Sequence, residues 1–442
     1  MTLSSAIIRG ALVAALGGLL FGFDTAVIAG TTGQLQDLFQ LSDANLGLTV
    51  ASALVGTILG SLLGGIPGDR YGRRDSLRIT AVLYVASALG CAFAWDWYSL
   101  LFFRLIGGLG IGASSVLGPM YIAEIAPAKW RGRLVGLFQF NVVAGILLAY
   151  LSNYLVGLFN FGSAEWRWKL GVSALPAAMF LLMLFGIPRS PRWLVSKGRI
   201  DEARQVLRLT EGSGADAELQ LIVASTKRDD LTGGQPLFGR KFRLPVFLAI
   251  SIAMFNQLSG INAILYYLNS IFAAAGFSKV SGDLQSVAVG VTNLLFTMLA
   301  MSIIDKAGRR TLLLIGAAGT AACLAGVAAI FRSGVHQNLL VWLLAGFIAF
   351  FGFSQGAVIW VYISEIFPTT VRAKGQSLGS FTHWAMNAAI AWSFPVIAAS
   401  SKAAPFVFFA AMMALQFFVV LFFYPETRNV SLEEMQKKLG IA

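Results

Sequence analysis

Long apolar stretches separated by short polar segments run through the whole chain. A stretch of about 20 apolar residues can cross the hydrocarbon core of a bilayer as one helix. Twelve such stretches can be recognised, at residues 6–30, 44–67, 76–95, 98–122, 133–159, 168–187, 243–274, 283–304, 311–331, 338–364, 374–398 and 404–424. The pattern therefore predicts an all-α membrane protein with 12 transmembrane helices.

Composition and charge agree with a protein that crosses the membrane many times. Hydrophobic residues make up 57% of the 442 residues and charged residues 12%, which is more apolar surface than a soluble protein of this size can bury. With a cytoplasmic N-terminus, the inner segments carry 27 of the 33 Lys and Arg residues and the outer loops carry five. This bias predicts a multi-pass protein of the cell membrane with both termini cytoplasmic. The net charge of +12 then reflects topology and contact with membrane lipid, and no nucleic-acid partner is expected.

Motifs in the predicted cytoplasmic loops occur twice. "DRYGRR" at 69–74 matches "DKAGRR" at 305–310, and "YIAEIAPAKWR" at 121–131 matches "YISEIFPTTVR" at 362–372. Because order and spacing agree, we expect two six-helix halves in the same orientation. The expected domains are an N-terminal six-helix bundle, a cytoplasmic helical linker, a C-terminal six-helix bundle and a cytoplasmic tail, at 1–187, 188–242, 243–424 and 425–442.

The linker is expected to form short cytoplasmic helices. Ser190 and Pro191 suit the N-cap and first turn of a helix that continues over 192–210. A second helix is expected over 215–228.

Asp24 is a carboxylate inside the first apolar stretch, where a charge costs about 2.5–3.5 kcal/mol or more at the bilayer centre. Arg104, inside the fourth stretch, lies at the same predicted depth, roughly 9 Å below the outer end of its helix. The two can therefore pair. One interpretation is a static ion pair that holds the two helices together; the other is a proton site whose affinity changes as the carboxylate approaches and leaves the guanidinium.

Amide and aromatic side chains form a second group of polar residues at mid-membrane. They are Gln139, Asn256, Gln257, Asn262, Asn293, Trp360, His383, Trp384 and Asn387. Amides both donate and accept hydrogen bonds without adding charge, which suits a neutral polyhydroxylated ligand, and tryptophan faces suit the C–H side of a sugar ring. The alternative is that the amides hold helices together. Ser259 and Gly260 are expected to break the helix so that Asn262 turns toward the same cavity.

The loop motifs, together with "FGFDTAVIAG", "SPRWL", "NQLSGINAILYY" and "YPETR", resemble those of the sugar porter family of the major facilitator superfamily over essentially the whole chain. The resemblance implies the major facilitator fold and the transport of a monosaccharide. It implies no cofactor and no metal, and we expect the protein to act as a monomer.

The resemblance also assigns roles to single residues. Proton-coupled members have an Asp at the position of Asp24, with an arginine matching Arg104, whereas facilitators commonly have Asn instead of the Asp. The positions that line the sugar site match Gln139, Gln257, Asn262, Asn293, Trp360 and Asn387, and those of the extracellular gate match Tyr266 and Tyr267. The inner-gate salt-bridge network matches Asp69, Arg73, Arg74, Glu124, Arg131, Asp305, Arg309, Arg310, Glu365 and Arg372.

Four residues depart from the family pattern. Asn256 stands where Gln is usual, and His383 stands where an amide is typical. Ile146 occupies a position at which a xylose-transporting relative has Gln and glucose facilitators have an aliphatic residue, which favours a hexose over a pentose. Arg189 replaces the acid of a P-E-S-P-R motif and so disturbs the charge balance of the first inner gate.

The sequence thus predicts proton-coupled import of a monosaccharide by alternating access. A facilitator without proton coupling is the first alternative, and a sugar sensor that does not transport is the second. The 18 residues after Tyr424 are shorter than the extensions typical of such sensors. An enzyme is not expected, because the sequence offers no nucleophile with a base, no metal cluster and no phosphate loop.

Overall fold

The computed structural model describes residues 4–127, 130–211, 214–229, 236–368, 371–428, 430 and 432–441. Within these ranges the chain forms helices and no strands, so the all-α prediction is confirmed. The helices of the first half are α1 (Ser5–Val27), α2 (Thr32–Phe39), α3 (Asp43–Leu63), α4 (Gly65–Tyr71), α5 (Arg73–Ala92), α6 (Trp97–Ile125), α7 (Arg131–Leu158), α8 (Glu165–Gly171) and α9 (Ala174–Met183).

The second half is interrupted more often than the first. Its helices are α13 (Arg243–Leu258), α14 (Ile261–Tyr266), α15 (Leu268–Ala274), α16 (Lys279–Ala307), α17 (Arg309–Ser333), α18 (Leu340–Phe353), α19 (Gln355–Ile366), α20 (Arg372–Ser400), α21 (Ala404–Phe423) and α22 (Leu432–Lys438). Gly260, with φ of +81°, separates α13 from α14, which confirms the break expected there.

Eleven helical segments of the described chain are long and apolar enough to cross a membrane. They match eleven of the twelve stretches expected from the sequence. The remaining stretch, 374–398, corresponds to α20, which is 29 residues long. Its polar residues, among them His383 and Asn387, make it less apolar than the other segments.

The described residues of the linker form three α-helices where two were expected. Ser190 accepts a hydrogen bond from the main-chain N–H of Trp193, and Pro191 opens α10 (Pro191–Ser196), as predicted. The expected continuous helix is wrong, because Gly198 has φ of +72° and α11 (Ile200–Glu211) starts after it. The helix expected over 215–228 is confirmed as α12 (Ala215–Asp229).

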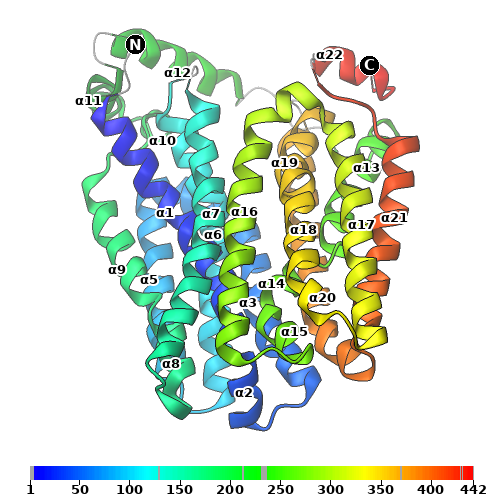
Figure 1. Cartoon of the computed structure of the whole chain (residues 1–442). Helices are drawn as coiled ribbons and strands as arrows, with labels where there is room; N and C mark the ends of the chain where they lie inside the picture. The colour runs from blue at the N-terminus through cyan, green and yellow to red at the C-terminus, as the bar shows by residue number, and fades with distance from the viewer. Residues whose placement is uncertain are drawn as a thin grey trace. The chain divides into compact units, whose positions relative to one another are not determined.

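The chain divides into two compact units that do not coincide with the two sequence halves. Unit 1 comprises Met1–Thr25, Ser52–Ala149 and Trp166–Gly233, and unit 2 comprises Ala26–Ala51, Tyr150–Glu165 and Gly234–Ala442. In unit 1, α9 lies beside α5, and α10, α11 and α12 lie at the end where α1 begins (Figure 1). In unit 2, α17 packs against α18 and α21, and α16 packs against α18 (Figure 1). The domain boundaries expected from the repeat stay a prediction.

Glycines bring α3 and α6 into close contact in unit 1. A Cβ on Gly56 would lie 2.2 Å from the main-chain oxygen of Leu105, and one on Gly108 would lie 1.9 Å from that of Ala53. A Cβ on Gly112 would lie 2.2 Å from the oxygen of Thr57. These distances are far below van der Waals contact, so only glycine permits this approach. The pairs are spaced four residues apart, which is the small-residue pattern of tightly packed membrane helices.

We expect Gly112→Ala to destabilise unit 1. The added methyl group would collide with the backbone of α3, and overpacking of this kind typically costs about 1–3 kcal/mol. The melting temperature of the purified protein in detergent should fall. Gly132→Ala, on α7, is the matched control because a Cβ there would have no neighbour within 4 Å. An unchanged melting temperature for Gly112→Ala would contradict the packing described here.

Candidate functional site

Gln257, at the end of α13, is the centre of a buried polar cluster in unit 2. Its Nε2 atom donates to Asn256 Oδ1 at 2.9 Å and lies 3.2 Å from the Nε2 atom of His383. Its Oε1 atom accepts from Asn262 Nδ2 at 3.0 Å. Gln257 is only 1% exposed, whereas Asn262 is partly exposed. The helix break at Gly260 allows Asn262 to reach back to Gln257, so both sides of the break contribute to one cluster.

Helix α20 supplies the imidazole and a further amide of this cluster. His383 and Asn387 are one turn apart and are both buried. Asn387 Nδ2 donates to Tyr266 Oη at 3.0 Å, while its Oδ1 atom is buried and accepts no hydrogen bond from the described residues. A buried amide oxygen without a donor is costly, and a ligand hydroxyl would satisfy it.

Aromatic rings border the same cluster. The Trp360 ring of α19 lies 5.3 Å from the His383 ring, and the Trp384 ring lies 4.9 Å from it, edge to face. Trp384 is buried, but Trp360 is 38% exposed and so keeps ring surface open to contact. A polar cluster beside an aromatic face has the two chemical features of a carbohydrate site.

The predicted sugar site and outer gate include three further residues. Asn293 on α16 is buried, and its Oδ1 atom accepts from Thr297 of the same helix at 3.4 Å. Tyr267 donates to the main-chain oxygen of Ala391, one turn along α20 from Asn387, at 2.9 Å. Gln139 lies on α7 in unit 1 and is partly exposed. The substrate and gate roles of all these residues stay a prediction.

Asp24 and Arg104 belong to unit 1, on α1 and α6. They are close enough to interact electrostatically, as the equal-depth argument expects. Arg104 is 4% exposed, whereas Asp24 is partly exposed. Tyr84 shares a 2.9 Å hydrogen bond with Ser114 and also interacts electrostatically with Asp24. The sequence pattern missed these two hydroxyls, because a Tyr and a Ser inside membrane helices are not distinctive by themselves.

The predicted inner-gate clusters form inside each unit. In unit 1, Arg73 donates to Glu124 and to Asp69, each at 2.9 Å. In unit 2, Arg309 pairs with Glu365 at 2.9 Å. The side chain of Asp305 lies outside the described residues. The remaining arginines bond to main-chain oxygens: Arg74 to Ile187, Arg131 to Ala126, Arg310 to Leu421 and Arg372 to Phe367.

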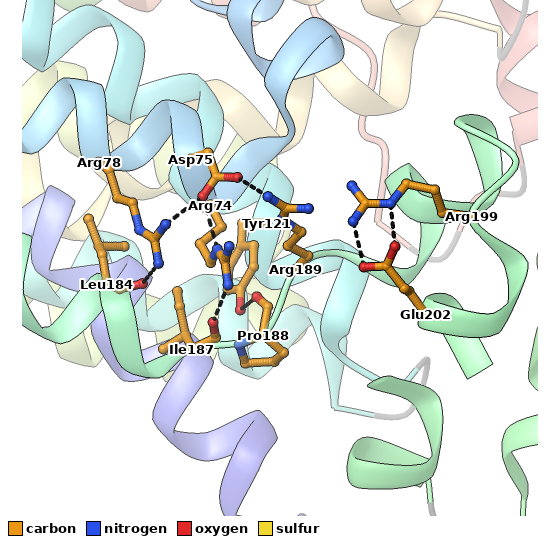
Figure 2. A network of polar contacts seen from close by, with 10 residues as sticks. All are labelled: Arg74, Asp75, Arg78, Tyr121, Leu184, Ile187, Pro188, Arg189, Arg199 and Glu202. Atoms are coloured by element: carbon orange, nitrogen blue, oxygen red, sulfur yellow. Dashed lines mark hydrogen bonds and ion pairs between the residues drawn. The ribbon is translucent and has the colours of Figure 1, made fainter. Parts of the chain in front are cut away.

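The two clusters differ where Arg189 replaces an acid. In unit 2, the carboxylate of Glu426 accepts from the main-chain N–H groups of Arg309 and Arg310, at 2.9 and 3.1 Å, and so caps α17. In unit 1, Arg189 pairs with Asp75 of α5 at 2.9 Å (Figure 2). Unit 1 therefore keeps a charge pair at this place, with Asp75 of α5 supplying the carboxylate. The inner-gate role of both clusters stays a prediction.

Asp75 also binds two further arginines. Arg74 and Arg78 lie 3.1 and 2.8 Å from its Oδ1 atom, and Figure 2 shows the three guanidinium groups around the one carboxylate. Sequence reasoning missed Asp75 because its pairing with Arg189 spans 114 residues. The only signal was the unbalanced charge of Arg189 itself.

We expect Asp75→Asn to destabilise the protein more than Arg189→Gln. Loss of the carboxylate leaves three clustered guanidinium groups, whereas loss of Arg189 leaves Asp75 with two partners. Because the groups are partly exposed, the expected cost is about 1–2 kcal/mol for Asp75→Asn and under about 1 kcal/mol for Arg189→Gln. Thermal unfolding of the two single variants and the double variant would measure this. Equal effects of the single variants would refute the shared-carboxylate arrangement.

Comparisons with known proteins agree with these features. Residues 10–439 match the family described as "Sugar (and other) transporter". The D-xylose-proton symporter of Escherichia coli K12 is 36% identical over 474 aligned positions, covering 98% of this chain and 96% of that protein. The arabinose-proton symporter of Bacillus subtilis is 38% identical, with 96% of this chain and 93% of that protein covered.

A solved structure of the xylose transporter XylE of Escherichia coli, in an inward open conformation, matches with a TM-score of 0.88. It is 35% identical to this chain, and the match covers 98% of this chain and 99% of that one. Since both the family match and these relatives extend over nearly the whole length, the chain belongs to the sugar (and other) transporter family.

Proposed function

We propose that this protein imports a monosaccharide together with protons across the cytoplasmic membrane by alternating access. The observation that carries the proposal is the joint presence of an uncharged amide cluster beside Trp360 and of a partly exposed intramembrane carboxylate, Asp24, near a buried arginine. The first can bind a neutral polyol, and the second can take up and release a proton. The relatives named as sugar–proton symporters support the same assignment.

The sequence supports one orientation in the membrane and one preferred class of sugar. The excess of Lys and Arg on one side supports cytoplasmic termini, so the repeated charge clusters lie on the cytoplasmic side. Ile146 supports a hexose as the preferred substrate, with a pentose as the second choice. As a member of a transporter family the protein is a carrier and not an enzyme. We propose that it works as a monomer in contact with membrane lipid.

Uptake into proteoliposomes tests the proposal directly. A proton gradient directed into the vesicles is imposed, and labelled glucose, xylose and arabinose are offered separately. The internal and external concentrations of each sugar are then compared. We expect at least one sugar to accumulate above its external concentration, and the accumulation to collapse when a protonophore is added. Equilibration without accumulation would identify a facilitator, and binding without flux would identify a sensor.

A further inference from the structure

First-half segments pack against second-half helices within unit 2. Tyr150 Oη of α7 donates to the main-chain oxygen of Leu265 on α14 at 2.8 Å. Thr32 at the start of α2 shares a 3.0 Å hydrogen bond with Ser270 of α15, and Figure 1 shows α2 and α15 at the same end of this unit. Trp392 of α20 donates to the main-chain oxygen of Ala44 at 3.2 Å. We call this set of contacts the seam.

The seam is tightly closed where α3 meets α20. A Cβ on Gly47 would lie 2.2 Å from the main-chain oxygen of Trp392, so no side chain fits between the two backbones. By the topology proposed above, these segments lie at the outer ends of their helices. The closed seam therefore corresponds to a closed outer side of the transporter.

An ion pair also crosses the seam. Lys279, the first residue of α16, lies 2.5 Å from the Oε2 atom of Glu165, the first residue of α8. Glu165 is 1% exposed, whereas the Lys279 side chain is 52% exposed. The carboxylate has thus lost its water, and the ammonium group provides a counter-charge from the second half of the chain.

A second carboxylate lies beside this pair. Asp283, one turn along α16 from Lys279, is 2% exposed and accepts a hydrogen bond from Asn269 of α15. A Cβ on Gly157 would lie 3.2 Å from Asp283 Oδ2 and 3.8 Å from Glu165 Oε1, so both acids border the same glycine of α7. Acids this close repel one another, which increases the dependence of the closed arrangement on Lys279.

We propose that the Glu165–Lys279 pair is a positioning pair for the outer gate: it holds the outer side closed and breaks when that side opens. The inference deepens the proposed function and rests on alternating access. Opening returns Glu165 to water, so the attraction between Glu165 and Lys279 is stronger in the closed state than in the open one. Removing Lys279 should therefore shift the population toward the outward-open state.

The two single variants should differ in a specific way. Lys279→Gln leaves Glu165 buried without this counter-charge and should open the outer side. Glu165→Gln places a neutral amide at the buried position, and the half-exposed Lys279 side chain can extend into water. The shift toward the outward-open state should therefore be small. The double variant should resemble Glu165→Gln, because the second change removes the cause of the opening.

Accessibility of one seam residue can measure the opening. Thr32, which is 1% exposed, is replaced by Cys in a chain whose Cys91 and Cys323 are replaced by Ala. The rate of labelling by a membrane-impermeant maleimide is then compared among the variants. We expect Lys279→Gln to raise the rate about tenfold or more, and the double variant and Lys279→Arg to stay near the parent rate. Lys402→Gln is the control, since Lys402 donates to the main-chain oxygen of Ala274 and is exposed.

Two outcomes would overturn the proposal. One is an unchanged labelling rate in a Lys279→Gln variant that still elutes as a folded protein. The other is a rise in Lys279→Gln that Glu165→Gln fails to reverse. The labelling assay requires no flux, so its result remains readable even if the uptake experiment shows that the protein does not transport.

Discussion

Asp24→Asn is expected to abolish the accumulation of sugar that a pH gradient drives. With one proton per sugar and a gradient of one pH unit, the parent protein can accumulate its substrate about tenfold, because one unit is worth about 1.4 kcal/mol. Asparagine keeps the size and the hydrogen-bonding oxygen of the side chain but takes up no proton. The internal-to-external ratio should therefore fall to about one in Asp24→Asn.

Exchange of sugar across the membrane should survive the same substitution. Asp24 takes no part in the hydrogen bonds of the amide cluster around Gln257, so the variant leaves those bonds unchanged. Counterflow in preloaded proteoliposomes without a pH gradient should run at a rate within a few-fold of the parent. Asp37→Asn, an exposed acid on α2, is the control for loss of a carboxylate.

Accumulation that persists in Asp24→Asn would show that Asp24 is structural. The carboxylate would then be the static partner of Arg104, and its removal should lower the melting temperature instead. Burial of a charge costs more when its partner is lost, and Arg104 is 4% exposed. Measuring stability and accumulation on the same preparation thus separates the two interpretations of this pair.

Much of the helical scaffold could be predicted because membrane-spanning helices follow from local composition. The interruptions of these helices were predictable only where a residue type such as glycine indicates one. Gly260 was recognised beforehand, and its φ of +81° explains the break. The α18–α19 break at Ser354 was not, because a serine does not by itself end an apolar helix. The short helix α2 was also missed, since it lies beyond the first apolar stretch.

The candidate site, like the helices, could be predicted only in part. His383 and Asn387 were predicted as members of one polar group at mid-membrane, and both are buried in the polar cluster. Long-range pairs could be predicted only where equal depth, as for Asp24 and Arg104, or a repeat indicated the partner. Asp75 with Arg189, and Lys279 with Glu165, each join residues 114 positions apart that have no counterpart in the other half. Charge counting placed these residues on a side of the membrane but gave no partner.

Gln257→Leu should weaken sugar binding more than any other single change in the amide cluster. Leucine fills a similar volume but leaves Asn256, Asn262 and His383 without the amide that each contacts. Leucine also makes no hydrogen bond to a sugar hydroxyl. At about 1 kcal/mol for each of two to three such bonds lost, the expected loss of binding free energy is about 2–3 kcal/mol, or roughly 30- to 150-fold in affinity. Isothermal titration with the transported sugar would measure the change.

The same experiment separates a sugar site from amides that only hold helices together. If the cluster binds sugar, affinity should fall strongly in Gln257→Leu while the melting temperature changes by a few degrees. If the amides only join α13 to α20, the melting temperature should fall and affinity should stay within about threefold. Gln376→Leu, at an exposed position of α20, controls for the loss of an amide elsewhere. A sugar-dependent rise in melting temperature that is present in the control and absent in Gln257→Leu would assign the cluster to substrate, because a ligand stabilises only the folded state that binds it.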